Sequence, residues 1–114
     1  MEDTKKEFLT TTVRLAVLGA LADEPKYGYQ LIKELHDTTD GFFKLREGAL
    51  YPVLHRLVKE GHLTAEWKRI KPGTSRRYYT ITPGGKAALI SHKEQWAGIV
   101  KAVETILSGG LGLA

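Results

Sequence analysis

The sequence predicts a mainly helical α+β domain, in which a two-stranded hairpin separates three helices from a long last helix. Two observations support this prediction. Between residues 63 and 82, two strand-like runs flank a Pro-Gly turn. Apolar residues recur at helical spacing over residues 4–22, 26–37, 47–60 and 83–107. A chain of 114 residues is long enough for one hydrophobic core.

The first two helices differ in how their apolar residues are spread. Residues 4–22 bear apolar side chains on more than one side, which indicates a helix covered by several neighbours. A turn over residues 38–41 ends the second helix, residues 26–37. The inward face of that second helix consists of Leu31, Ile32 and Leu35.

The third helix, residues 47–60, has an apolar and a polar side. Gly61 follows it, where a residue with left-handed backbone geometry commonly ends a helix. The side expected to be buried consists of Leu50, Val53, Leu54, Leu57 and Val58. The solvent side, which we place opposite this stripe, consists of Tyr51, His55, Arg56 and Lys59.

Two strands follow, and we expect them over residues 63–69 and 76–82, with residues 71–75 as a polar tip. Thr82 can then cap the last helix. Pro83 can occupy its first position, because proline lacks the N–H that has no partner there. This order of elements is that of a winged helix-turn-helix domain with an extra C-terminal helix.

The positive charge is concentrated in one third of the chain. The whole chain has a net charge of +4, but residues 44–77 alone have nine Lys or Arg and three Glu, a net of +6. Such clustering is typical of a protein that binds a polyanion. A short helix beside a basic hairpin suits duplex DNA, because the helix fits the major groove and the hairpin reaches the neighbouring backbone.

Several residues of this basic segment are candidate DNA contacts. The small residues Gly48 and Ala49 would let backbone N–H groups approach a phosphate, although they also suit a tight turn. Tyr51 could contact a phosphate or a base edge. Arg56 and Lys59 could bind phosphate or remain solvated surface charges. Five cations on the hairpin would repel one another unless a bound anion reduces the repulsion. Alternatively, their charges could prevent an edge strand from pairing with another chain. They are Lys68, Arg69, Lys71, Arg76 and Arg77.

The last helix has an apolar seam of the kind that joins two helices. Its residues alternate at spacings of three and four: Leu89, His92, Trp96, Ile99, Val103 and Ile106. Pairing with a second copy would cover this seam and supply two recognition helices for a palindromic site. We therefore expect a winged-helix domain over residues 1–82, a dimerisation helix over 83–107 and a disordered tail over 108–114.

Other classes of protein find little support in the sequence. The four histidines are scattered, no cysteine is present, and we find no nucleophile elbow, P-loop or dinucleotide-binding motif. We therefore expect neither an enzyme nor a bound metal or cofactor. No apolar run approaches the ~18 residues that span a bilayer, and no signal peptide is evident. We expect a cytoplasmic protein without membrane contact.

Four segments combine in a specific order along the chain: Tyr27–Leu31, Gly48–Leu57 with Lys59-Glu60-Gly61, Arg76–Thr82, and Gly85. Together they resemble the PadR family of bacterial transcriptional regulators over residues from about 10 to 107. The first opens the second helix and the last opens the final helix. In place of the Ser or Thr that often begins the recognition helix of this family, the chain has Gly48-Ala49, which removes a side-chain phosphate contact.

The resemblance implies a homodimer that represses transcription and leaves its operator when a small effector binds. It implies DNA contact at Tyr27 and Gly28, at Gly48, Ala49 and Tyr51, and at the hairpin arginines. With one C-terminal helix, the chain is similar to the short subfamily. In some multidrug-binding members of that group, a tryptophan at the place of Trp96 stacks on flat aromatic drugs across the dimer axis.

We therefore expect a repressor released by a small planar apolar effector. Phosphates would be held by Arg56, Lys71, Arg76 and Arg77. The expected effector pocket lies between the first and last helices and comprises Trp96, His92, Phe8, Leu15 and Val100. Two alternatives remain: a winged-helix module that binds an acidic protein, and a constitutive repressor without an effector.

Overall fold

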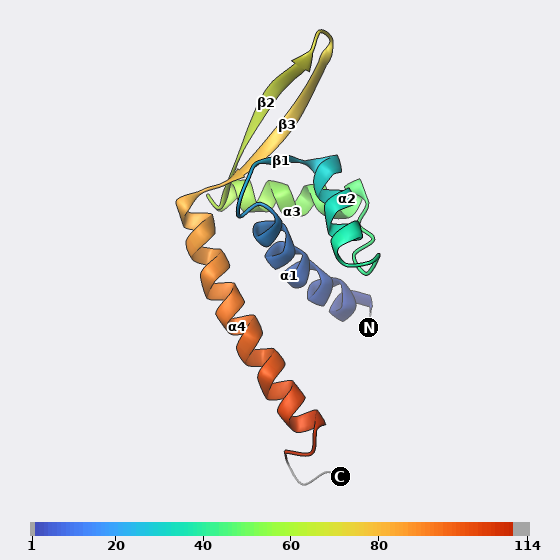
Figure 1. Ribbon diagram of the computed structural model, residues 1–114, viewed down its shortest axis with the longest axis vertical. Helices are drawn as coiled ribbons and strands as arrows, with labels where there is room; N and C mark the ends of the chain where they lie inside the picture. The colour runs from blue at the N-terminus through green and yellow to red at the C-terminus, as the bar shows by residue number, and fades with distance from the viewer. Residues whose placement is uncertain (1, 111–114) are drawn as a thin grey trace.

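The winged helix-turn-helix architecture predicted from the sequence is confirmed. A computed structural model describes the backbone of residues 2–110 and the side chains of residues 11–110. A hairpin projects from one end of the helical body and a long helix extends from the other, giving extents of 65 × 28 × 25 Å (Figure 1). The elements are α1 (Glu2–Ala20), β1 (Lys26–Tyr27), α2 (Gly28–Thr38), α3 (Glu47–Lys59), β2 (Leu63–Lys71), β3 (Thr74–Ile81) and α4 (Pro83–Leu107).

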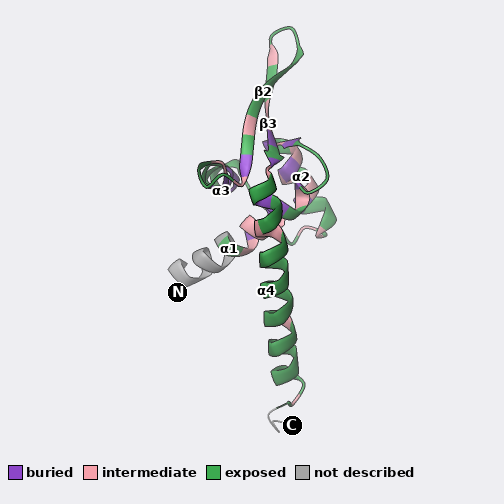
Figure 2. Cartoon of the chain, turned by 90° about the vertical axis from the view of Figure 1, so that its left-hand side faces the viewer, coloured by how far each residue is buried: buried purple, intermediate pink, exposed green. Residues whose placement is uncertain are grey.

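The hydrophobic core lies where α1, α2 and α3 meet the base of the sheet, whereas most of α4 is exposed (Figure 2). The predicted inner stripe of α3 is buried except for Val58, which is only partly covered. Each fully buried leucine stabilises the fold by about 1.5–3 kcal/mol. The core consists of Val13, Val17, Leu18, Leu21, Leu31, Leu35, Leu50, Val53, Leu54, Leu57, Leu63, Tyr79 and Ile81.

The sheet has three strands in the order β1-β3-β2, one more than the sequence predicted. Lys26 and Tyr27 were expected to begin the second helix, but they pair antiparallel with Tyr79 and Tyr78 of β3. The backbone of Tyr27 is extended, so α2 starts at Gly28, two residues later than predicted. The earlier helix start was therefore wrong.

The side chain of Lys26 explains why this short strand lies against the core. It is almost fully buried, at 3% exposure. Its ammonium donates hydrogen bonds to the carbonyl of Ala20 at 2.5 Å and to Oε1 of Glu34 at 2.7 Å. A buried cation without such partners would be strongly destabilising. These two bonds fix β1 between the end of α1 and the outer side of α2.

The hairpin of β2 and β3, which we call the wing, turns more tightly than predicted. Lys71 pairs with Thr74, so the turn consists of Pro72 and Gly73 alone rather than of residues 71–75. Gly73 has a φ of +79°, as the third residue of a type II turn requires. The register shifts between Arg69 and Lys71, which leaves a bulge at the exposed Ile70.

The predicted cap of α3 and the predicted cap of α4 are both confirmed, and they contact each other. Gly61 has a φ of +81° and ends α3 in a Schellman motif, with the His62 N–H bonded to the Leu57 carbonyl at 2.9 Å. Thr82 Oγ1 accepts the N–H of Gly85 at 3.0 Å and donates to the Gly61 carbonyl at 2.6 Å. The start of α4 is thereby joined to the end of α3.

The two ends of the chain differ from expectation in small ways. Helix α1 ends at Ala20 rather than at residue 22. Ser108, Gly109 and Gly110 belong to an ordered turn, in which the Gly110 N–H donates to the Thr105 carbonyl at 2.9 Å. Of the expected tail over 108–114, only residues 111–114 lie outside the described part of the chain. Within that part, no helix is both long and apolar enough to cross a membrane.

Candidate nucleic-acid interface

The outward face of α3 is formed by residues that recur every three or four positions, opposite the buried leucines. All four of them are exposed: Gly48, Pro52, His55 and Lys59. Of these, Gly48 and Lys59 were considered from the sequence as phosphate contacts. His55 was recognised as solvent-facing but was not predicted to contact DNA, although the same spacing that identified the core stripe also identifies it. This stripe is the part of α3 that a DNA groove would meet first.

Tyr51 lies on the flank of α3 rather than opposite the core stripe, which corrects the orientation expected from the sequence. Its side of the helix faces the start of α2, and a Cβ placed on Gly28 would lie only 2.5 Å from its hydroxyl oxygen. Gly28 is therefore buried, and a partner approaching this place meets the Tyr51 ring instead. Burial, and next the nearby Glu47, raises the pKa of Tyr51 above its ordinary value of 10.

The first turn of α3 offers fewer backbone donors than expected. The N–H of Ala49 already donates to the carbonyl of Arg46 at 3.0 Å. Gly48, one residue earlier, is the better position for a backbone contact to phosphate, because the first N–H groups of a helix have no acceptor within it. Both residues are exposed.

The other end of α3 is tied to α1. Arg14 of α1 donates to Oε1 of Glu60, the residue that caps α3, at 2.8 Å. Arg56 lies one turn before Glu60 and is exposed on the same flank. Tyr51 and Arg56 therefore border the outward stripe of α3 from opposite sides.

The five cations of the wing do not gather at one place, as the sequence suggested, because neighbouring residues of a strand point to opposite faces of the sheet. Lys68 pairs with Arg76 on one face, whereas Arg77 pairs with Trp67 on the other. The Arg77 guanidinium carbon lies 5.7 Å from the centre of the Trp67 ring. Repulsion is thus limited by separation onto two faces and by contact with aromatic rings.

Most of the predicted seam on α4 is uncovered in the single chain. Trp96, Ile99, Val103 and Ile106 are between 44% and 57% exposed. Leu89 differs from them, because it is partly buried against the chain's own core beside Ala88. The first turns of α4 therefore pack on the helical body, while the rest of the seam extends beyond it (Figure 2).

The residues expected to bind an effector lie on α1 and α4. His92 and Trp96 are exposed on α4, whereas Val100 and, on α1, Leu15 are partly buried. The side chain of Phe8 lies outside the described residues.

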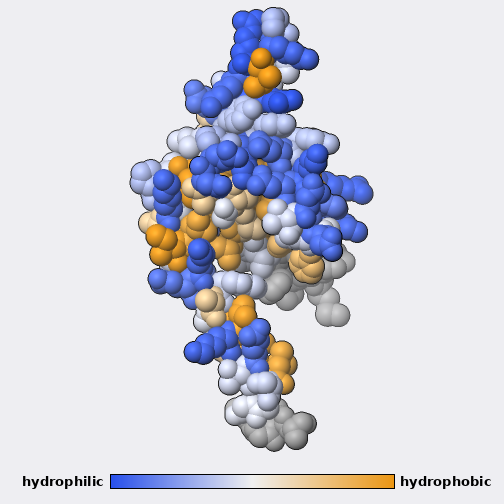
Figure 3. All heavy atoms as spheres, viewed as in Figure 1, coloured by the Kyte–Doolittle hydropathy of each residue, from blue (hydrophilic) through white to orange (hydrophobic). Residues whose placement is uncertain are grey.

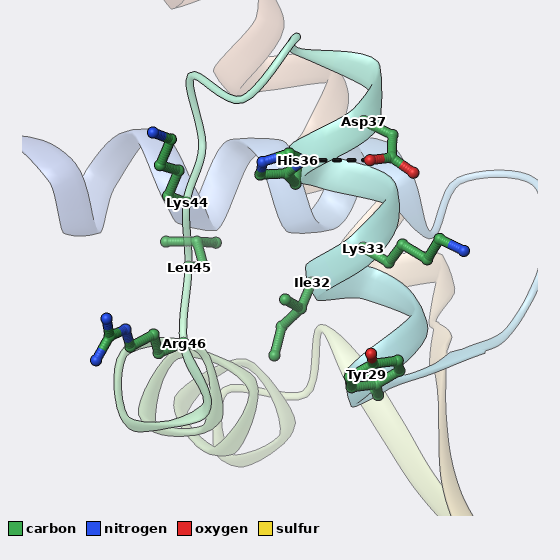
Figure 4. A pocket seen from close by; sticks show the side chains of 8 residues that line it. All are labelled: Tyr29, Ile32, Lys33, His36, Asp37, Lys44, Leu45 and Arg46. Atoms are coloured by element: carbon green, nitrogen blue, oxygen red, sulfur yellow. Dashed lines mark hydrogen bonds and ion pairs between the residues drawn. The ribbon is translucent and has the colours of Figure 1, made fainter.

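A hollow of about 390 Å³ occurs elsewhere, between α2 and residues 44–46. The sequence did not reveal it, because it forms only when the loop packs beside the helix. Lys33 points away from Lys44 and Arg46, so the hollow does not direct its cations toward one ligand (Figure 4). Its lining consists of Tyr29, Ile32, Lys33, His36, Asp37, Lys44, Leu45 and Arg46.

Comparison with known proteins identifies the family. The model of the "Transcriptional regulator PadR-like family" matches residues 17–91, two thirds of the chain. The chain belongs to the PadR-like family of transcriptional regulators. It is 37% identical over 98 residues to the transcriptional regulator Rv3488 of Mycobacterium tuberculosis, covering 86% of this chain and 88% of that protein. PadR-like proteins are regulators of transcription, not enzymes.

Solved PadR structures share the fold. A PadR family regulator from Eggerthella lenta superposes with a TM-score of 0.78 at 30% identity, covering 93% of this chain and 90% of that one. Bacillus subtilis PadR in complex with operator DNA superposes with a TM-score of 0.64 at 25% identity, covering 69% of this chain and 45% of that one.

Proposed function

We propose that this PadR-like regulator is a homodimeric repressor that binds a palindromic operator and leaves it when a small planar apolar effector binds. The observation that supports DNA binding most strongly is the position of the wing. The wing rises beside α3 and points away from α4, so the recognition helix and the cationic hairpin can reach DNA while α4 is free to pair (Figure 1). A repressor of this kind would act in the cytoplasm.

The division of contacts follows from the geometry. The outward stripe of α3 with Gly48 would enter the major groove, bordered by Tyr51. Arg56 would bind the backbone at one side of the groove. The wing, through Lys71, Arg76 and Arg77, would hold phosphates farther along the duplex. Tyr27 and Gly28 join these two groups, because Tyr27 pairs with Tyr78 of the wing and Gly28 lies against Tyr51 of α3. The similarity in fold to Bacillus subtilis PadR, which was solved in complex with operator DNA, supports DNA binding by this chain.

Dimerisation is supported by the uncovered seam of α4. Four large apolar side chains lie in one stripe and are about half exposed. Pairing with a second copy would remove them from water, which would stabilise the dimer. They are Trp96, Ile99, Val103 and Ile106. Two-fold pairing presents two α3 helices to one side of the duplex, which is why we propose a palindromic operator.

The proposed effector site lies in the middle of the α4 seam. Trp96 is exposed in the middle of the seam, and two copies near the dimer axis would offer flat apolar faces to a planar ligand. His92, one turn earlier, could donate a hydrogen bond to such a ligand. Leu15 of α1 and Val100 of α4 would complete an apolar wall.

DNA binding can be tested by fluorescence anisotropy with a labelled duplex from upstream of the protein's own gene. The affinity should fall steeply between about 50 and 200 mM salt, because bound phosphates release counterions. Arg76→Ala with Arg77→Ala should weaken binding to every duplex and flatten the salt dependence, whereas Lys101→Ala on α4 should do neither. A domain that instead binds an acidic protein would show no affinity for duplex even at low salt.

The effector can be tested through tryptophan fluorescence. The chain has two tryptophans, so Trp67→Phe leaves Trp96 as the only reporter. A planar dye such as rhodamine 6G should quench Trp96 and reduce operator binding together. Quenching without loss of operator binding would favour a constitutive repressor.

A further inference from the structure

Four side chains on one face of the sheet form a continuous series of cation–ring and ring–ring contacts, which we call the aromatic ladder. The Arg76 guanidinium carbon lies 4.4 Å from the centre of the Tyr27 ring. Tyr27 and Tyr78 meet edge to face, with centres 5.5 Å apart. The Lys68 ammonium lies 5.0 Å from the centre of the Tyr78 ring. The series crosses all three strands and has a cation at each end.

The two cations would repel each other without these rings. Lys68 and Arg76 are direct cross-strand partners, both are exposed, and like charges placed opposite each other destabilise a hairpin. The face of an aromatic ring is negative, so each tyrosine attracts one of the cations and holds it at a fixed place. Strand β1 consists of only two residues, and Tyr27 is the one that it contributes to this face.

We propose that Tyr27 and Tyr78 are positioning residues, which hold Arg76 and Lys68 in the orientation in which both bind DNA phosphates. The proposal rests on the proposed function. A free arginine or lysine side chain loses many rotamers when it binds a phosphate, whereas one already stacked on a ring loses few. The aromatic ladder thus shifts the cost of ordering these side chains from DNA binding to folding. Tyr27 would act through Arg76 and not through its own hydroxyl.

A double-mutant cycle tests whether Tyr27 acts through Arg76. Operator affinity is measured by anisotropy for the wild type, Tyr27→Leu, Arg76→Ala and the double variant. When Arg76 is present, Tyr27→Leu should weaken operator binding about two- to fivefold per wing. It should have no further effect once Arg76 is alanine, because its target is gone. Tyr27→Phe keeps the ring without the hydroxyl and is the matched control, with wild-type affinity expected.

Each other outcome overturns the inference. Wild-type affinity for Tyr27→Leu means that the contact only stabilises the hairpin. Equal losses from Tyr27→Leu and Tyr27→Phe mean that the hydroxyl binds DNA directly, and additive losses mean that the two residues act independently. If the wild type binds no duplex, the proposed function itself fails.

Folding is checked for every variant by circular dichroism and thermal melting. If Tyr27→Leu disrupts β1, the same cycle with Tyr78→Leu and Lys68→Ala tests the other end of the aromatic ladder by the same criterion.

Discussion

The hydroxyl of Tyr51 lies over Gly28, in the space that a side chain on Gly28 would occupy. Helix α3 and the start of α2 therefore approach so closely that the Tyr51 ring fills the space left by the missing Cβ of residue 28. This contact sets the position of Tyr51 at the edge of the outward stripe of α3. It also explains why Gly28 is buried although it lies at the start of a helix near the surface.

Replacing Gly28 by alanine should displace the Tyr51 ring. The ring is 39% exposed and can swing outward, so we expect a loss of stability of only about 1 kcal/mol, at the lower end for overpacking. Operator affinity should fall as well, because Tyr51 leaves its place beside the groove. Urea unfolding and anisotropy measure the two effects. Adding Tyr51→Leu should restore the stability but not the affinity. Unchanged affinity in Gly28→Ala would remove Tyr51 from the interface.

The raised pKa of Tyr51 predicts a loss of stability in alkaline solution. The unfolded chain releases the phenol proton near pH 10, whereas the folded protein retains it to higher pH. The stabilisation is therefore complete below about pH 10 and declines as the pH rises through the raised pKa. Tyr51→Phe cannot lose this proton. Its urea midpoint should fall less than that of the wild type between pH 8 and alkaline solution. Identical pH dependence would contradict the prediction.

Two glycines of α4 should respond oppositely to alanine. A Cβ on Gly85 would overlap the carbonyl oxygen of His62, which is backbone and cannot swing aside. We expect Gly85→Ala to destabilise the protein by about 2–3 kcal/mol. Gly98 has no atom within 4 Å of its Cβ position, so Gly98→Ala should stabilise the helix by about 0.5–1 kcal/mol. Thermal melting compares the two. Equal changes in melting temperature for the two variants would show that the junction of α3 and α4 can accommodate a Cβ at residue 85.

A charge in the α4 seam should separate the dimer. Ile99→Glu would place two carboxylates at the proposed interface, and we expect the dimer dissociation constant to rise on the order of 100-fold or more. Lys101→Glu, two residues along and outside the seam, is the control and should leave the dimer intact. Sedimentation equilibrium measures both. A dimer that tolerates Ile99→Glu would contradict pairing through α4.

The sequence predicted long periodic elements well. The stripe of Leu50, Leu54 and Leu57 recurs over several turns, so α3 and its buried face could be recognised from spacing alone. Gly61 and Thr82 were recognisable because helix caps depend on single residue types. Strand β1 was not, since two residues have no period, and its position depends on the buried bonds of Lys26.

The arrangement of the wing cations was missed because strand register depends on the turn. A five-residue tip over 71–75 would have placed Arg69 opposite Arg77. The observed two-residue turn and the bulge at Ile70 place Lys68 opposite Arg76 instead. Which cation stacks on which ring follows from this register and from β1. The aromatic ladder could not be found before the three strands were placed.

The most direct test of the account is the composition of the protein–DNA complex. Sedimentation velocity with a labelled palindromic duplex of about 30 base pairs, long enough for two half-sites one helical turn apart, counts the chains bound to each duplex. We predict two chains per duplex at low salt, and a dimer of the protein alone at micromolar concentration. A single chain per duplex, or no co-sedimentation at low salt, would contradict the account.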